Sequence, residues 1–196
     1  MTENRLPTRD AAYFEKLYAE NPDPWNFTAS AYERTKYAAT LAMLGDRRFA
    51  RGLEVGCSIG VLTKLLAGPC EQLLAVDTVA QTVARAKARC AGAPHVTFEC
   101  MQVPQNWPVG EFDLIVLSEI LYFLHPTDIA RTAALANASL VEGGVILLVN
   151  YTEDIDEPCS GREAAEIFER AVLPGISRVD HLSRKSFCIE LLLKRH

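Results

Sequence analysis

The sequence predicts a doubly wound α/β fold, in which helices cover both faces of a mostly parallel sheet. Residues 51–63 read Arg-Gly-Leu-Glu-Val-Gly-Cys-Ser-Ile-Gly-Val-Leu-Thr, which is an apolar strand, a turn of small residues and the start of a helix. A second apolar strand, residues 72–77, ends in Asp77. Two final stretches of strand character, residues 176–182 and 186–194, predict an antiparallel hairpin. A strand, small-residue turn and helix, followed by an acid about 20 residues on, form the first unit of a nucleotide-binding sheet.

The turn after the first strand has features of a ligand site. Gly56 and Gly60 allow the backbone to approach a ligand closely, and the carboxylate of Asp77 can accept both hydroxyls of a ribose. The glycine turn alone fits a tight connection between strand and helix equally well. Asp77 at the end of the next strand favours a nucleoside site.

The acidic residue inside the first strand separates this turn from a dinucleotide site. Glu54 precedes a turn spaced Gly-x-Ser-x-Gly, not Gly-x-Gly-x-x-Gly. This form resembles motif I of the class I S-adenosylmethionine-dependent methyltransferases. The resemblance implies a Rossmann-like sheet of seven strands with a C-terminal antiparallel hairpin, and S-adenosyl-L-methionine as the cofactor, released as S-adenosyl-L-homocysteine. Ser58 replaces the family's middle glycine, so we expect a turn without positive φ there.

Length and charge limit the domain count and the partners. The 196 residues, 49% of them hydrophobic, suffice for one domain with a sizeable core. We expect a single domain over residues 1–196, with an N-terminal helical cap over residues 1–45 and a Rossmann-like core over residues 46–196. The net charge of −5 provides no attraction to a polyanion, so we expect no nucleic-acid partner.

Cysteine usage and hydropathy indicate a reduced, cytoplasmic protein. The six cysteines include no Cys-x-x-Cys pair, and several lie in apolar strand or helix patterns, where cysteine is usually a small buried hydrophobe. The amino terminus has no apolar signal core, and no run approaches the length of a membrane span. We therefore expect a cytoplasmic location and no membrane partner.

Two helices and an aromatic loop are predicted before the first strand. Apolar spacing predicts a helix over residues 8–20 and a second from residue 29 or 30 to about residue 44. Two prolines exclude helix from residues 21–27, so Trp25 and Phe27 lie on a loop. The two rings either plug the core or form a lid, since aromatic faces stabilise the positive charge of a methyl sulfonium.

Three residues of the second helix are candidates for contact with the cofactor. Tyr32 and Lys36 share a face at i, i+4 spacing, and Arg34 points elsewhere. All three fit a solvated face, whereas a cation near the cofactor would hold its methionine carboxylate.

The pattern continues beyond the first two strands. Residues 79–91 predict a helix with a solvated basic face, and residues 94–100 predict the third strand. The loop of residues 101–104 follows, where methyltransferases of this class contact adenine. The resemblance implies that Gln102 contacts the base edge and that apolar neighbours such as Val103 cover its face. The acid often found at this turn in the family is missing.

The fourth predicted strand leads into the acceptor side of the site. Residues 112–117 form a continuous apolar run, typical of the centre of a parallel sheet. Residues 118–125 follow, at the edge where open α/β sheets bind ligands, and resemble motif IV, which borders the transferred methyl. Glu119, Tyr122 and His125 are the leading polar groups. Tyr122 fits core packing and His125 a helix cap equally well, whereas a carboxylate next to an apolar strand needs a partner.

The fifth predicted strand, residues 145–151, places Asn150 and Tyr151 at the same edge. The acidic loop after it, residues 153–159, is long enough to carry acceptor contacts. Two helices complete the pattern: residues 127–140, opened by Pro126 and stopped by Glu142-Gly-Gly144, and a helix from Ser160 or Gly161 to about Val172.

Three segments resemble a narrower family, the rhizobial nodulation-factor N-methyltransferases of the nodulation protein S type. They are Asp23-Pro-Trp25, Tyr32-Glu33 with Lys36 downstream, and Ser118-Glu-Ile-Leu-Tyr-Phe123. The resemblance extends over nearly all of the chain. It implies methylation of the free amine on the non-reducing terminal glucosamine of a deacetylated chitooligosaccharide, before fatty acylation.

The expected chemistry is an in-line attack of a neutral amine on the sulfonium methyl. Alignment of the reactants supplies most of the gain, and no metal is required. Glu119, or a water that it holds, is the candidate proton acceptor, although a carboxylate can also orient the amine without acting as a base. The predicted catalytic residues are Glu119, Tyr122 and His125; the predicted cofactor-binding residues are Trp25, Phe27, Arg34, Glu54, Gly56, Ser58, Gly60, Asp77, Thr78, Gln102, Val103 and Ser118.

Two other functions fit the sequence. One is methyl transfer to another small nucleophile, such as a carboxylic acid or a phenol, which a screen of acceptors would distinguish. The other is a non-catalytic module that binds the cofactor without turnover. Glu54 and the terminal hairpin disfavour a nicotinamide dehydrogenase. We expect a monomer or a weak homodimer.

Overall fold

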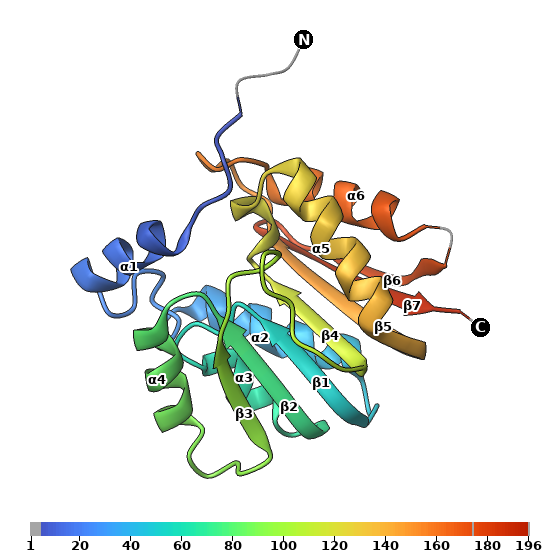
Figure 1. Cartoon of the computed structure of the whole chain (residues 1–196), viewed down its shortest axis with the longest axis horizontal. Coiled ribbons are helices and arrows are strands. Elements are labelled where there is room, and N and C mark those ends of the chain that lie inside the picture. The colour runs from blue at the N-terminus through green and yellow to red at the C-terminus, as the bar shows by residue number, and fades with distance from the viewer. Residues whose placement is uncertain (1–4, 174, 196) are drawn as a thin grey trace.

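Seven strands form one sheet in the order β3-β2-β1-β4-β5-β7-β6 (Figure 1). The structure is a computed structural model that describes residues 5–173 and 175–195. The strands are β1 (Phe49–Val55), β2 (Cys70–Asp77), β3 (Val96–Cys100), β4 (Phe112–Ser118), β5 (Leu140–Tyr151), β6 (Ile176–Ser183) and β7 (Phe187–Lys194). The first five pair in parallel, and β7 runs antiparallel to both β5 and β6. The predicted class I methyltransferase sheet with its C-terminal hairpin is therefore confirmed.

The strand order reverses at β1, which lies between β2 and β4. In the register, Val55 pairs with Val76 on one side and Leu117 on the other, while Asp77 pairs with Cys100. The carboxyl ends of the parallel strands therefore meet at one edge of the sheet. Crevices at such a reversal are where open α/β sheets bind ligands.

Helices cover both faces of the sheet and its carboxyl edge. In Figure 1, α5 and α6 lie in front of the half of the sheet that contains β4 and β5, whereas α2 and α3 lie behind the sheet. The separate α1 lies beyond the carboxyl edge. The helices are α1 (Ala11–Glu20), α2 (Ala31–Leu44), α3 (Val61–Leu66), α4 (Ala80–Arg89), α5 (Pro126–Ser139) and α6 (Gly161–Val172), with a short 3-10 helix, η1 (Leu121–Phe123).

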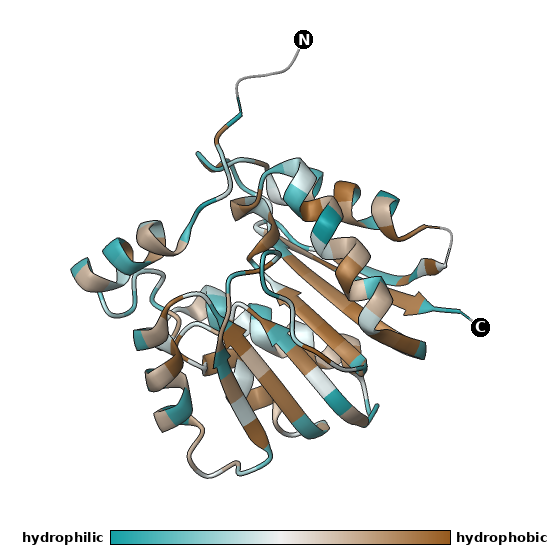
Figure 2. Cartoon of the chain, in the orientation of Figure 1, coloured by the Kyte–Doolittle hydropathy of each residue, from teal (hydrophilic) through white to brown (hydrophobic). Residues whose placement is uncertain are grey.

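The core lies on the two faces of the central strands. Leu114, Ile115, Val116 and Leu117 of β4 are all fully buried, because both faces of this strand are covered. Ile115 and Leu117 pack with residues of α5 and α6, whereas Leu114 and Val116 pack with residues of α2 and α3. Figure 2 shows the central strands as hydrophobic along most of their length. This rigid sheet positions the loops at its carboxyl edge.

Several element boundaries differ from the sequence expectations. The first helix begins at Ala11 with Asp10 as its cap, because the side chain of Thr8 instead bonds to Asp128. The predicted stop at residues 142–144 lies inside β5, which starts at Leu140, directly after α5. The 3-10 helix η1 was not predicted.

Within residues 5–173 and 175–195, no helix has the length and apolar character needed to cross a bilayer. The same residues contain no group of three or more acidic, histidine or cysteine side chains that could hold a metal ion. All six cysteines are free, and five are buried as expected, whereas Cys100 is exposed.

Candidate active site

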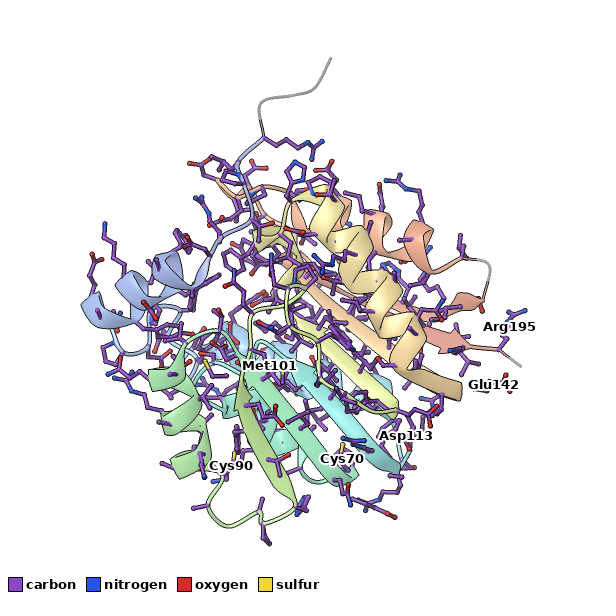
Figure 3. All side chains as sticks on the ribbon, viewed as in Figure 1. Cys70, Cys90, Met101, Asp113, Glu142 and Arg195 are labelled. Atoms are coloured by element: carbon purple, nitrogen blue, oxygen red, sulfur yellow. The ribbon has the colours of Figure 1, made fainter. Side chains whose placement is uncertain are left out.

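A cavity opens at the carboxyl edge of the sheet, where β1, β2, β3 and β4 end. Figure 3 shows Met101, which lines it, just beyond β3, whereas Cys70 and Asp113 lie at the opposite edge. Side chains from α1, the loop after it, α2, α3 and η1 also contribute to the lining. The lining includes, of the predicted residues, Trp25, Phe27, Glu54, Gly56, Ser58, Asp77, Thr78, Gln102, Val103, Ser118, Glu119 and Tyr122.

The glycines of the turn after β1 are required by close contacts. Gly56 has a φ of 83°, and a Cβ added there would lie 2.2 Å from Cγ2 of Ile120. Gly60 has a φ of 79°, and its added Cβ would lie 2.8 Å from Cα of Ala86. Gly56 lines the cavity, whereas Gly60 begins α3 and allows it to pack against α4. The turn is therefore held between two neighbouring segments.

The prediction that Ser58 needs no positive φ is wrong, because its φ is 47°. The left-handed conformation costs a non-glycine residue about 1–2 kcal/mol. Two contacts compensate for this cost. The Ser58 amide donates to Oδ2 of Asp77 at 2.8 Å, and its hydroxyl shares a short hydrogen bond with the buried Tyr18 hydroxyl. Serine thus adopts the glycine conformation and adds a contact between the turn and α1.

Asp77 is fixed by the backbone around it. Its Oδ1 accepts from the Val79 amide at 3.0 Å and from the Thr82 hydroxyl at 3.1 Å, while Oδ2 accepts from Ser58. Burial raises the pKa of Asp77, and these hydrogen bonds oppose that shift. A carboxylate oxygen can accept two hydrogen bonds, so Oδ2 retains capacity for one ligand hydroxyl, and not for the two ribose hydroxyls expected from the sequence.

Two more polar side chains near Asp77 are buried without a partner. Glu54 is 1% exposed, and its Oε2 has no hydrogen-bond partner among the described residues. Burial raises the pKa of Glu54 to about 7, against a smaller opposing effect of the Thr63 hydroxyl. The hydroxyl of Thr78 is also buried and unpaired. Buried polar groups without partners are costly, so both groups fit a site that a polar ligand completes.

The loop after β3 covers the same side of the cavity. The amide of Met101 donates to the carbonyl of Asp77 at 2.9 Å, and the carbonyl of Gln102 accepts from the Asn106 amide at 2.8 Å. These bonds leave the side chains of Met101, Gln102 and Val103 at the cavity wall. The wall is therefore mostly apolar with one amide, as predicted for a surface that contacts a flat base.

An aromatic cluster lies over the mouth of the cavity. The ring of Trp25 contacts Tyr18, Phe27 and Phe123 with centroid distances of 5.7, 5.6 and 6.2 Å. Its loop is held by Asp23, whose carboxylate accepts from the amides of Phe27 and Thr28. Trp25 is 37% exposed, whereas Phe27 is partly buried and packs against the hydrophobic core, so the two rings fit both the cover and the plug that the sequence left open.

The predicted acceptor side contains a cluster of buried and partly buried charges. Lys36 is 1% exposed and forms ion pairs with Glu33 at 2.9 Å and with Glu119. The hydroxyl of Tyr32 donates to the other oxygen of Glu119 at 2.6 Å. Burial and the charge of Glu119 raise the pKa of Tyr32, so this hydroxyl keeps its proton. Glu119 therefore has the partners that a carboxylate at this position needs.

The structure does not bring Arg34 to the cavity. Its side chain is exposed and donates to the carbonyl of Ala29 at 2.7 Å. The face of α2 that lies against the site carries Glu33, Lys36 and Tyr37. Lys36, and not Arg34, is thus the cation of α2 that lines the cavity.

The two other predicted acceptor-side residues differ in placement. Tyr122 lines the cavity and is 8% exposed, and burial raises the pKa of its hydroxyl well above the ordinary value. His125 lies outside the cavity lining and caps α5, with Nδ1 2.9 Å from the Thr127 hydroxyl. The helix-cap interpretation of His125 accounts for its position.

Asn150 was expected at the ligand-binding edge and the acidic loop was expected to contact the acceptor, and the structure gives both a different setting. Asn150 is fully buried and does not line the cavity. In the acidic loop, both oxygens of Glu157 are occupied, by Arg9 at 2.7 Å and by the Tyr13 hydroxyl at 3.0 Å. Glu157 therefore anchors Arg9 and the first turn of α1 to the acidic loop.

Sequence reasoning missed several lining residues, chiefly Phe14, Tyr18, Tyr37 and Phe123. Phe14 and Tyr18 stand at i, i+4 spacing in a predicted helix, which indicates a shared face. That spacing does not say which surface the face meets. Only the position of α1 in the structure shows that Phe14 and Tyr18 line the cavity.

Comparisons with known proteins agree with this architecture. Residues 12–152 match the family model of nodulation protein S. Nodulation protein S of Bradyrhizobium diazoefficiens is 38% identical over 103 residues, which cover 52% of this chain and 49% of that protein. The protein of Sinorhizobium fredii is 35% identical over 112 residues, which cover 57% and 52%. The chain thus matches about half the length of these curated relatives.

A solved structure extends the likeness over nearly the whole chain. The N-methyltransferase NodS from Bradyrhizobium japonicum, in complex with S-adenosyl-L-homocysteine, superposes with a TM-score of 0.81 at 21% identity. The superposition covers 95% of this chain and 98% of that chain, so the two share a fold.

The contact between Gly56 and Ile120 predicts a large effect of Gly56→Ala. The added methyl would clash with Ile120 and impose a positive φ on alanine, so we expect the free energy of unfolding to fall by about 2–4 kcal/mol. Gly143→Ala is the matched control, because Gly143 has a φ of 76° and open space around it. It should lose only about 1 kcal/mol. If urea denaturation gave both variants the same loss in the free energy of unfolding, Ile120 would not constrain the turn.

Proposed function

Since the chain belongs to the nodulation protein S family, we propose that it is an S-adenosylmethionine-dependent N-methyltransferase of nodulation-factor biosynthesis. The acceptor is the free amine of the non-reducing terminal glucosamine of a deacetylated chitooligosaccharide. The observation that carries the proposal is the presence of Glu119 in the same cavity as the glycine turn and Asp77. One cavity thereby combines a nucleoside site with a carboxylate for the acceptor.

The residues present fit S-adenosyl-L-methionine. Oδ2 of Asp77 has capacity for a ribose hydroxyl, and Gln102 and its apolar neighbours suit an adenine ring. Glu54 offers an unpaired carboxylate for an ammonium group, and Thr78 offers an unpaired hydroxyl. Trp25 and Phe27 provide ring faces that favour a positive charge. When bound, the cofactor supplies an electrophilic methyl group on a sulfonium.

The charge of the acceptor side favours an amine. Lys36 provides one positive charge beside the carboxyl groups of Glu33 and Glu119, and burial raises the pKa of Glu33. A carboxylate at Glu119 attracts a cationic amine and repels a carboxylate acceptor. A carboxylic acid is therefore the weaker alternative. The side chain of Glu119 is 14% exposed, so it is accessible from the cavity.

Glu119 and the cavity walls perform three tasks in the reaction. The carboxylate binds and orients the amine, the aromatic cover excludes water, and the carboxylate or a water that it holds accepts the proton after transfer. Tyr122 lies beside this site with its hydroxyl protonated. Alignment of the two reactants accounts for most of the rate enhancement, with effective molarities of roughly 10⁵–10⁸ M.

Replacing Asp77 should weaken cofactor binding. A charge-assisted hydrogen bond to a buried hydroxyl contributes about 1.5–3 kcal/mol, so Asp77→Ala should raise the Kd for S-adenosyl-L-homocysteine by roughly 10-fold to 100-fold. Calorimetry measures this, with Asp154→Asn, an exposed acidic residue, as the control. Circular dichroism verifies that the variant is folded. An unchanged Kd would remove Asp77 from the site.

Glu54 should make cofactor binding depend on pH. Its pKa of about 7 means that the carboxyl is largely protonated at pH 6 and ionised at pH 8. Only the ionised form pairs with the ammonium of S-adenosyl-L-homocysteine, so affinity should rise with pH by up to about tenfold per unit until it levels above pH 7. Glu54→Gln should remove this dependence. A wild-type Kd that is constant from pH 6 to 8 would rule out the pairing.

The choice of acceptor tests the function directly. An acetamide nitrogen shares its lone pair with the carbonyl and is a poor nucleophile, whereas a free amine has it available when unprotonated. We expect methylation of terminally deacetylated chitooligosaccharide only, at a rate that rises with pH as the bound amine loses its proton. Mass spectrometry reports the added methyl group. Methylation of the fully acetylated oligomer, or none of the deacetylated one, would contradict the proposal.

A further inference from the structure

Helix α2 contributes a buried bridge of charges to the acceptor side of the cavity. Nζ of Lys36 lies between the carboxylates of Glu33 and Glu119, with Glu33 Oε1 at 2.9 Å. Lys36 and Glu33 are 1% and 2% exposed. The bridge therefore connects a helix before the first strand to the segment that follows β4.

The start of α2 leaves Glu33 free for this bridge. Ser30 caps the helix, and the spacing Ser-x-x-Glu is that of a capping box, in which the glutamate returns to the amide of the cap residue. Here the Ser30 amide donates to the carbonyl of Asn26 at 2.9 Å instead. The carboxylate of Glu33 bonds to Lys36; burial raises the pKa of Glu33, while the charge of Lys36 and hydrogen bonds from Lys36 and Tyr37 oppose that shift.

The bridge restricts Glu119 at both oxygens. Oε2 pairs with Lys36, and Oε1 accepts from the Tyr32 hydroxyl, whose ring also lies 5.0 Å from the Lys36 ammonium. The backbone of Glu119 has a φ of 55°, and its amide donates to the carbonyl of Val149 at 2.7 Å. Each carboxylate oxygen keeps one further lone-pair position, so the group is oriented and can still accept from an amine.

Stability alone is a weak explanation for this cluster. Moving charges out of water is costly, and apolar residues of similar size are often equally stabilising in place of a buried ion pair. The two carboxylates also exceed the single cation. Left-handed backbone at a non-glycine residue, as at Glu119, is a further cost that occurs most often at functional sites.

We propose that Lys36 and Glu33 are positioning residues, which hold the Glu119 carboxylate in the orientation that binds the acceptor amine. The inference rests on the proposed function and adds to it that helix α2 is part of the acceptor site. Lys36 fixes Glu119 by direct pairing, and Glu33 fixes Lys36. Without the bridge, the carboxylate is free to rotate about its side-chain bonds, and the amine is no longer aligned with the methyl.

The test compares variants that remove the bridge with one that preserves it. Lys36→Met alone leaves two buried carboxylates without a cation and is a risk to folding, so the main variant is Glu33→Gln with Lys36→Met, in which the pair is neutral. Thr35→Ala, an exposed position on the same helix, is the control. The measurements are the melting temperature, the Kd for S-adenosyl-L-homocysteine, and kcat and KM for the deacetylated chitooligosaccharide.

We expect the double variant to be folded, to bind S-adenosyl-L-homocysteine within about threefold of wild type, and to lose about 10-fold to 100-fold in kcat/KM. Thr35→Ala should match wild type in melting temperature, Kd, kcat and KM.

An unchanged kcat/KM in the double variant would overturn the positioning role and leave the proposed function intact. A Kd weakened more than tenfold would overturn it too, because Lys36 would then hold the cofactor. An inactive wild-type protein would refute the proposed function itself, and the positioning role with it.

Discussion

The hydrogen bond from the Ser58 amide to Asp77 joins the ends of two neighbouring strands, and the proposed cofactor half of the cavity depends on it. Parallel pairing of β1 and β2 brings both ends to one edge, and Gly56 and Gly60 allow the turn to bend there. The same turn contacts α1 through the Ser58 and Tyr18 hydroxyls. The two hydrogen bonds of Ser58 thus connect the turn to the carboxyl edge of the sheet and to α1.

The acceptor half depends on charge. Lys36 is the cation that pairs with both the buried Glu33 and the partly buried Glu119, and it links α2 to the end of β4. The segments before the first strand are therefore structural parts of the cavity on both sides: α1 through aromatic packing and α2 through ion pairs. Arg9 and Tyr13 extend this arrangement by anchoring the start of the chain to Glu157.

The fold and the position of the glycine turn beside Asp77 were predictable because their signals are local. A glycine turn after an apolar strand, an acid at the end of the next strand and an apolar run in β4 each constrain the backbone within a few residues. The acceptor half depends on helix orientation, which spacing does not supply. Arg34 and Lys36 are both cations on one helix, and only tertiary packing shows that Lys36 faces the cavity.

The positive φ of Ser58 was missed for a similar reason, since its compensating partner, Tyr18, is 40 residues distant in sequence. His125 was ambiguous because a histidine before a proline-led helix fits a cap and a catalytic group equally well.

One cavity is proposed to hold the cofactor and the sugar amine side by side, with Glu119 oriented toward the amine. The most direct measurement is a crystal structure of the protein with S-adenosyl-L-homocysteine and a deacetylated chitooligosaccharide. The terminal amine nitrogen is expected to lie within hydrogen-bond distance of Glu119, about 2.7–3.2 Å, and to face the cofactor sulfur. An oligosaccharide bound with its amine away from Glu119, or outside this cavity, would contradict this arrangement.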